Sequence, residues 1–174
     1  MEMISLAEHS GGILPYRYNK GVLQVMLAHP GGPFWINKDR GAWSIPKGIK
    51  EKNETIIDAA KREFREETGI EIDRGLIDLG TIKQPSGKMV TIFAAEMEID
   101  ATKVKSNLFE MEWPPKSGHL QMFPENDRAE WFNVEEARVK IFRGQRGFLD
   151  KLKSVLNCSE PSEGKCWIQM SLFE

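Results

Sequence analysis

The chain of 174 residues is 40% apolar and 29% charged, a composition typical of a folded domain that excludes a largely disordered chain. Its 24 basic and 26 acidic residues give a net charge of −2, so we expect neither a membrane surface nor duplex nucleic acid as a partner. No stretch reaches the roughly 18 consecutive apolar residues of a membrane helix, and residues 1–12 lack the features of a signal peptide. The two cysteines, Cys158 and Cys166, indicate neither a disulfide framework nor a metal site, so we expect a cytoplasmic protein.

The first half of the chain favours short strands and loops followed by one amphipathic helix. Apolar runs broken by glycine, proline and asparagine predict the strands and the loops between them. The helix has an expected N-cap at Asn53, an acidic residue, Glu54, in its first turn, and a terminating glycine, Gly69. In chain order, we expect strands at Ser10–Tyr16 and Val22–Ala28, a loop at 29–41, a short strand at Ala42–Ile45, and a helix from Asn53 to about Thr68.

The second half of the chain predicts the remaining strands and two shorter helices. In chain order, we expect strands at Leu79–Gln84 and Met89–Met97, an ordered loop or insertion at about 100–127, a strand at Glu130–Phe132, a helix from the cap Asn133 to Val139, and a helix at Gln145–Leu156. The alternation of strands and helices predicts an α+β fold with helices packed on a mixed sheet. We expect one domain over residues 1–157, followed by a poorly ordered tail at 158–174.

An acidic run lies on the helix predicted at 53–68. On a helical wheel, Glu63 and Glu67 fall inside the apolar arc and Glu66 lies at its edge. Carboxylates one turn apart on the packed side of a helix are costly unless a cation compensates them, which argues against a merely solvated face. Their oxygens suit a hard divalent ion such as Mg²⁺ or Mn²⁺. We therefore expect metal-assisted phosphoryl chemistry, in which waters and substrate phosphates complete the coordination shell.

Arg62 directly precedes this acidic run. It can pair with Glu66 one turn later or with Glu54 two turns earlier, and either pair would hold the cluster in place. From spacing alone, an ordinary surface ion pair is an equally good interpretation.

The segment from Gly48 to Ile70 resembles the Nudix box. The resemblance implies an α/β/α sandwich around a mixed sheet, with the box as a loop–helix–loop, and hydrolysis of nucleoside diphosphates linked to another moiety by water attack at phosphorus. It also implies that Glu63, Glu66 and Glu67 are metal ligands, one of them a candidate base. The carbonyl of Lys47 or Gly48 would add a further ligand, and Arg62 and Glu54 would form an ordering pair. The matching positions are Gly48, Glu54, Arg62, Glu63, Phe64, Glu66, Glu67, Gly69 and Ile70.

Outside the box the resemblance is less specific. Trp43–Gly48 is similar to the corresponding segment of Nudix enzymes that cleave dinucleoside polyphosphates or diphosphoinositol polyphosphates, and 29–33 and 109–115 resemble a bacterial branch of pyrophosphohydrolases. We expect a Mg²⁺-dependent pyrophosphohydrolase, with Mn²⁺ as a substitute, acting on a nucleoside triphosphate or dinucleoside polyphosphate. The alternatives are a diphosphoinositol polyphosphate, the 5′ end of RNA, and a non-catalytic domain that senses a nucleotide. A small nucleotide is the expected partner, and a homodimer is compatible with the sequence.

Several residues outside the helix are candidates for substrate or metal contacts. Trp35, like Phe34, lies in a glycine–proline loop, where an aromatic ring either stacks on a base or packs on the insertion. A further carboxylate, Glu125 or alternatively Glu130, is expected to complete the metal site or act as base. The histidines are scattered, and we expect them in solvated loops. Basic residues that would form a rim for a polyphosphate chain are Lys38, Arg40, Lys47, Lys50 and Lys52.

Overall fold

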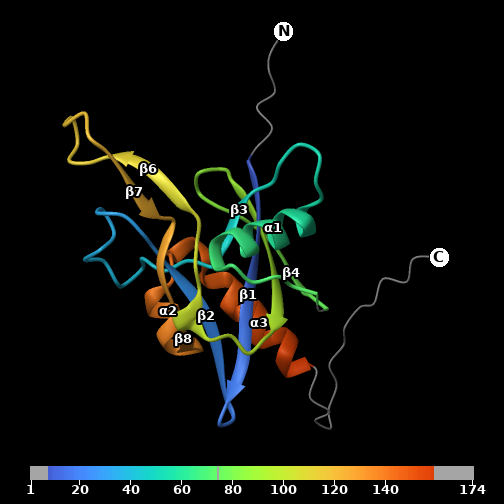
Figure 1. Ribbon diagram of the computed structural model, residues 1–174. Helices are drawn as coiled ribbons and strands as arrows, with labels where there is room; N and C mark the ends of the chain where they lie inside the picture. The colour runs from blue at the N-terminus through green and yellow to red at the C-terminus, as the bar shows by residue number, and fades with distance from the viewer. Residues whose placement is uncertain (1–7, 74, 159–174) are drawn as a thin grey trace.

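The computed structural model describes residues 8–73 and 75–158, which fold around one six-stranded mixed sheet (Figure 1). Its strands are β1 (His9–Asn19), β2 (Val22–Pro30), β3 (Lys47–Ile49), β4 (Ile77–Lys83), β5 (Met89–Glu96) and β8 (Asn126–Asn133). The strand order is β4-β5-β1-β2-β8, and β3 pairs with β1 beside this path. β1 is parallel to β5 and antiparallel to β2 and β3, so the predicted mixed sheet is confirmed.

Helices cover both faces of this sheet. α1 (Ile56–Thr68) packs on one face with a core that includes Ile13 and Phe64. α2 (Val134–Lys140) and α3 (Arg146–Cys158) pack on the other face, around Trp43 and Phe148 (Figure 1). This arrangement confirms the predicted α+β sandwich. Within the described ranges, no helix combines the length and apolar character needed to cross a membrane. The predicted tail lies outside the described residues from 159 onward.

The segment 43–49 is inserted into a fork between β1 and β2. The pairing of these two strands is confined to one end of the hairpin, and the first part of β1 pairs with β3 instead. Ser44 exchanges backbone hydrogen bonds with Ala28 of β2, and the carbonyl of Pro46 accepts one from Ile13 of β1 at 3.0 Å. The short strand predicted at Ala42–Ile45 is therefore a pair of isolated bridges. The fork holds β3 against α1.

The start of α1 differs from the prediction, whereas its end and its packed face agree. The N-cap is Thr55 rather than Asn53, because the Thr55 side chain accepts a hydrogen bond from the backbone of Asp58 at 3.2 Å. Gly69 ends the helix in the left-handed region, with φ of 76°, and donates its N–H to the carbonyl of Arg65. The side chains buried along the predicted apolar arc include Ala59, Ala60 and Phe64.

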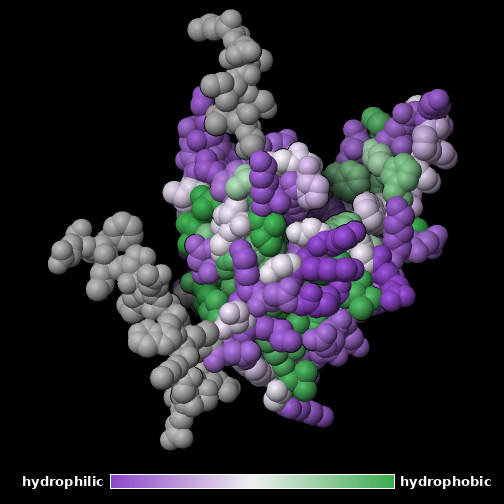
Figure 2. Space-filling view, turned by 180° about the vertical axis from the view of Figure 1, so that it is seen from behind, coloured by the Kyte–Doolittle hydropathy of each residue, from purple (hydrophilic) through white to green (hydrophobic). Residues whose placement is uncertain are grey.

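The predicted insertion at about 100–127 contains a β-hairpin rather than mostly loop. β6 (Leu108–Glu112) and β7 (Leu120–Pro124) form a separate two-stranded sheet, and β8 starts at Asn126, earlier than the predicted Glu130. The hairpin stands away from the body as a lobe with hydrophobic patches (Figure 2). It contacts the 31–35 loop, because the rings of Phe34 and Trp113 pack edge to face at 5.3 Å.

His29 is buried, contrary to the prediction that the histidines lie in solvated loops. Its Nε2 donates to the carbonyl of Lys38 at 2.7 Å, and its Nδ1 lies 2.9 Å from the carboxylate of Asp127. Its ring also packs against Trp43. His29 therefore fastens the loop after β2 to the first residues of β8, which follow Glu125 directly.

Candidate active site

The guanidinium group of Arg62 connects the segment before α1 to the acidic face of the helix. It binds both carboxylate oxygens of Glu54, at 2.7 and 3.1 Å, and the carbonyl of Ile49 at 3.0 Å. Its Nη1 donates to Glu63 at 2.7 Å and to Glu66 at 3.3 Å. Hydrogen bonding to Arg62 lowers the pKa of Glu54, so this carboxyl group is held in its charged form. The geometry favours an ordering role for Arg62 over that of an isolated surface pair.

The carboxyl group of Glu63 lies against the backbone of Gly48. A Cβ atom on Gly48 would lie 2.0 Å from the carboxyl carbon of Glu63. Only glycine at position 48 therefore allows the Glu63 side chain to lie where it does. Burial raises the pKa of Glu63, and the neighbouring Glu66 and Glu125 add to this effect, while Arg62 opposes it. Gly48 therefore shapes the site by having no side chain.

Glu67 lies in the most unfavourable surroundings for a negative charge. Its pKa is raised to about 8, chiefly by burial and also by Glu63 and Glu125, while the Asn126 amide and the Lys47 ammonium oppose the rise. The Nδ2 atom of Asn126 is buried and has no hydrogen-bond partner within 3.5 Å, so this amide compensates the charge only in part. A bound cation would supply the compensation that this carboxylate lacks.

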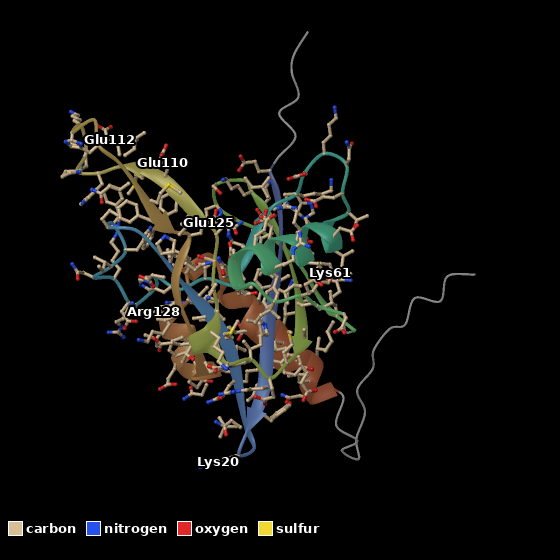
Figure 3. All side chains as sticks on the ribbon, in the orientation of Figure 1. Lys20, Lys61, Glu110, Glu112, Glu125 and Arg128 are labelled. Atoms are coloured by element: carbon tan, nitrogen blue, oxygen red, sulfur yellow. The ribbon has the colours of Figure 1, made fainter. Side chains whose placement is uncertain are left out.

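Glu125 approaches the helix from the end of β7. In Figure 3 it lies between the hairpin and α1, and its pKa is raised by burial and by the charge of Glu66. Its backbone is held on both sides, because its N–H donates to Asn107 at 2.9 Å and its carbonyl accepts from Gly31 at 2.8 Å. We call Glu63, Glu66, Glu67 and Glu125 the glutamate cluster. Glu130, the alternative prediction, is exposed and pairs with Arg128 at 3.5 Å.

The predicted basic rim is only partly brought to the glutamate cluster. Lys47 lies close enough to lower the pKa of Glu67. Lys38 instead lies 4.5 Å over the ring of Trp35, and that ring also packs against the ring of Phe142 at 5.5 Å. Arg40 lines a separate cavity beside α2 and α3. Of the remaining lysines, Lys50 binds the carbonyl of Glu51 and Lys52 is exposed.

The donor set of the glutamate cluster fits a hard divalent cation. Its side-chain donors are all carboxylate oxygens, and burial, together with the neighbouring carboxylates, raises the pKa values of Glu63, Glu67 and Glu125. In the arrangement described for residues 8–73 and 75–158, no three His, Cys, Asp or Glu side chains are placed so that they could hold a metal ion. Arg62 engages two of the carboxylates in this arrangement. The sequence interpretation missed Asn126 as a residue of the site. The only sequence signal for it was its position next to Glu125.

The raised pKa of Glu67 makes the metal-free protein sensitive to pH. Because the folded-state pKa of about 8 exceeds the ordinary value of 4.5, ionised Glu67 destabilises the fold as the pH rises from 4.5 to 8. In EDTA, we expect Glu67→Gln to raise the melting temperature by roughly 2–8 °C at pH 9 and to leave it nearly unchanged at pH 4.5. Thermal melts of this variant and of the control Glu110→Gln, on the hairpin, test the prediction. An equal shift at both pH values would contradict it.

Comparison with known sequences identifies relatives over most of the chain. The family model described as NUDIX domain matches residues 17–152. Nudix hydrolase 7 of Arabidopsis thaliana is 25% identical over 134 residues, which cover 72% of this chain and 46% of that protein. RNA pyrophosphohydrolase of Bartonella henselae is 26% identical over 148 residues, which cover 70% of this chain and 79% of that protein. The chain thus spans about half the length of the Arabidopsis relative.

Solved structures with low sequence identity share the fold. An Ap4A hydrolase of C. elegans, in a binary complex, matches with a TM-score of 0.60 and 21% identity over 86% of this chain and 98% of its own. A mutT/nudix family protein from Listeria innocua matches with a TM-score of 0.60 and 19% identity over 86% and 94% of the two chains. The NUDIX domain of Shewanella oneidensis NrtR, complexed with ADP ribose, matches with a TM-score of 0.60 and 13% identity over 88% and 90%.

Proposed function

This chain belongs to the Nudix family, and from that premise we propose that it is a Mg²⁺-dependent pyrophosphohydrolase. Its proposed substrates are nucleoside triphosphates or dinucleoside polyphosphates, cleaved by attack of water at phosphorus. The observation that carries the proposal is the confinement of Glu67 among further carboxylates with insufficient compensating charge. Such a cluster is unfavourable in the absence of a ligand, and divalent metals are what Nudix hydrolases generally use.

We assign a separate task to each part of the site. Glu63, Glu66 and Glu67, with a backbone carbonyl of Gly48 or Lys47, are the proposed ligands of the metal, which when bound neutralises phosphate charge and activates water. Glu125, on the hairpin side of the cluster, completes the ligand set or accepts the proton of the attacking water. Arg62 and Glu54 hold the carboxylates in register, and Gly69 ends the helix beneath them. Lys47 stabilises negative charge on the phosphates.

A metal-dependent substrate panel tests this proposal. The panel contains nucleoside triphosphates, dinucleoside polyphosphates, nucleotide sugars and diphosphoinositol polyphosphates, each with Mg²⁺, with Mn²⁺ and with EDTA. We expect hydrolysis of a tri- or polyphosphate substrate that EDTA abolishes and Mg²⁺ restores, with product masses locating the broken bond. Turnover that persists in EDTA, or none with any member of the panel, would contradict the proposal.

The 5′ end of RNA is a second candidate substrate. The relative named RNA pyrophosphohydrolase supports it, because 79% of that protein is covered by the match. Adding a 5′-triphosphorylated oligonucleotide to the panel decides between this substrate and free nucleotides. The alternative of a non-catalytic sensor is less well supported, because the box retains all of its carboxylates. A sensor would bind a nucleotide in the same panel without releasing product.

A further inference from the structure

A cavity of about 450 Å³ begins at Lys47, next to the glutamate cluster. It lies between the β4–β5 turn, which contributes Gln84 and Ser86, and the turn before α3, which contributes Arg143 and Gln145. Lys47 links the cavity to the cluster, because its ammonium group acts on the carboxylate of Glu67. No acidic residue lines the cavity.

The side-chain donors of this cavity are largely uncommitted. Among the described residues, Lys47, Gln84, Ser86 and Arg143 make no side-chain hydrogen bond or ion pair. Some other cations at the surface of this fold are paired, among them Lys140 with Asp39, Arg138 with Asp150 and Arg128 with Asp127. Two unpaired cations and two neutral donors around a cavity without acids form a site for an anion.

The framework that holds the two cations is connected by hydrogen bonds. Gln145 is buried, and its side chain accepts from the backbone N–H of Ile45 at 2.8 Å and donates to Ser44 at 3.0 Å. The backbone of Phe142 donates to the carbonyl of Trp43 at 2.8 Å. The turn that carries Arg143 is therefore fastened to the segment that leads into Lys47. Such preorganisation lowers the cost of binding a ligand between them.

We propose that the Lys47–Arg143 cavity binds a substrate phosphate that lies beyond the pyrophosphate bond being cleaved. Preferred substrates then carry a chain of three or more phosphates, whereas nucleotide sugars, with two phosphates and a neutral second group, leave Arg143 unused. This inference rests on the proposed function for the identity of the substrate. The anion site itself is independent of catalysis, so it can be tested separately.

Binding of inorganic tripolyphosphate in EDTA tests the cavity without turnover. Calorimetric titration of the full chain is expected to show binding that weakens about 10- to 100-fold in Arg143→Gln. Lys20→Gln is the matched control, because Lys20 is also exposed and lies at the distant β1–β2 turn (Figure 3). Absence of binding to the wild-type chain, or equal binding by both variants, would overturn the inference.

Steady-state kinetics in the presence of Mg²⁺ provide a second test of the proposal. Arg143→Gln is expected to reduce kcat/KM for a dinucleoside tetraphosphate by about 10- to 100-fold, mainly through KM, and to leave any cleavage of ADP-ribose unchanged. A uniform loss on both substrates would assign Arg143 a general structural role and overturn the specificity claim. If the wild-type chain binds tripolyphosphate but hydrolyses nothing, the proposed function fails while the anion site stands.

Discussion

We expect the Glu67→Gln substitution to lower the rate of hydrolysis by about three orders of magnitude or more and to leave the fold intact. The amide retains the shape of the side chain and removes its charge. Glu67 is the natural centre of the cluster, because Glu63, Glu125 and Lys47 all act on its carboxyl group. We therefore expect loss of its charge to weaken cation binding more than loss of charge at a peripheral position.

Glu66 provides the internal comparison for this prediction. Its carboxylate already has a cationic partner, because it pairs with Arg62 at 3.3 Å, and its side chain is 35% exposed. We expect Glu66→Gln to lose less turnover than Glu67→Gln. Steady-state rates at saturating Mg²⁺, with circular dichroism to verify folding, measure both, and Glu110→Gln is the control. Turnover by Glu67→Gln near the wild-type rate would refute its assignment as a ligand.

Local sequence signals were sufficient to predict the helix that carries the site. The apolar arc of α1, its glycine terminator and the cap of α2 at Asn133 each depend on residues within about one turn. The Nudix box could also be recognised from local sequence, since its fixed positions lie in one continuous segment. The misplaced N-cap shows the limit of this approach. Glu54, expected in the first helical turn, instead lies before the helix, where it binds Arg62 and the backbone of Glu51.

Contacts between distant segments were not predictable in the same way. His29 meets Asp127 across 98 positions of sequence, and spacing gives no information about such a pair. The β6–β7 hairpin was missed because its strands pair only with each other and leave hydrophobic side chains such as Leu120 exposed, so their burial pattern is weak. Glu125 lies close enough to Glu66 for the two charges to interact, but its position depends on this same hairpin.

The basic rim shows how a loop can separate neighbours in sequence. Lys38 and Arg40 lie within ten residues of Lys47, yet the structure places them elsewhere. The reason is that the loop is attached to other elements: the carbonyl of Lys38 accepts from His29, and Asp39 pairs with Lys140 of α2. Residues close in sequence are therefore expected to share a site only where the loop between them is not held against other elements.

Gly48→Ala is expected to reduce turnover by about 100-fold with a change in stability below about 1 kcal/mol. The new methyl group would stand 2.0 Å from the carboxyl group of Glu63, which is the far end of a flexible side chain and can move aside. Moving it disrupts the 2.7 Å contact with Arg62 and displaces one proposed ligand. Steady-state kinetics and chemical denaturation measure the two effects, and Gly75→Ala, where a Cβ atom meets nothing within 4 Å, is the control.

The contrast with Gly12 makes this prediction specific to the site. A Cβ atom on Gly12 would lie 2.5 Å from the carbonyl oxygen of Pro46, a backbone atom that cannot move without opening the fork between β1 and β2. Gly12→Ala should therefore lose stability, whereas Gly48→Ala should lose activity in a protein that melts normally. If Gly48→Ala retained wild-type turnover, the position of the Glu63 carboxylate would be irrelevant to the reaction. If it unfolded instead, Gly48 would serve the sheet rather than the glutamate cluster.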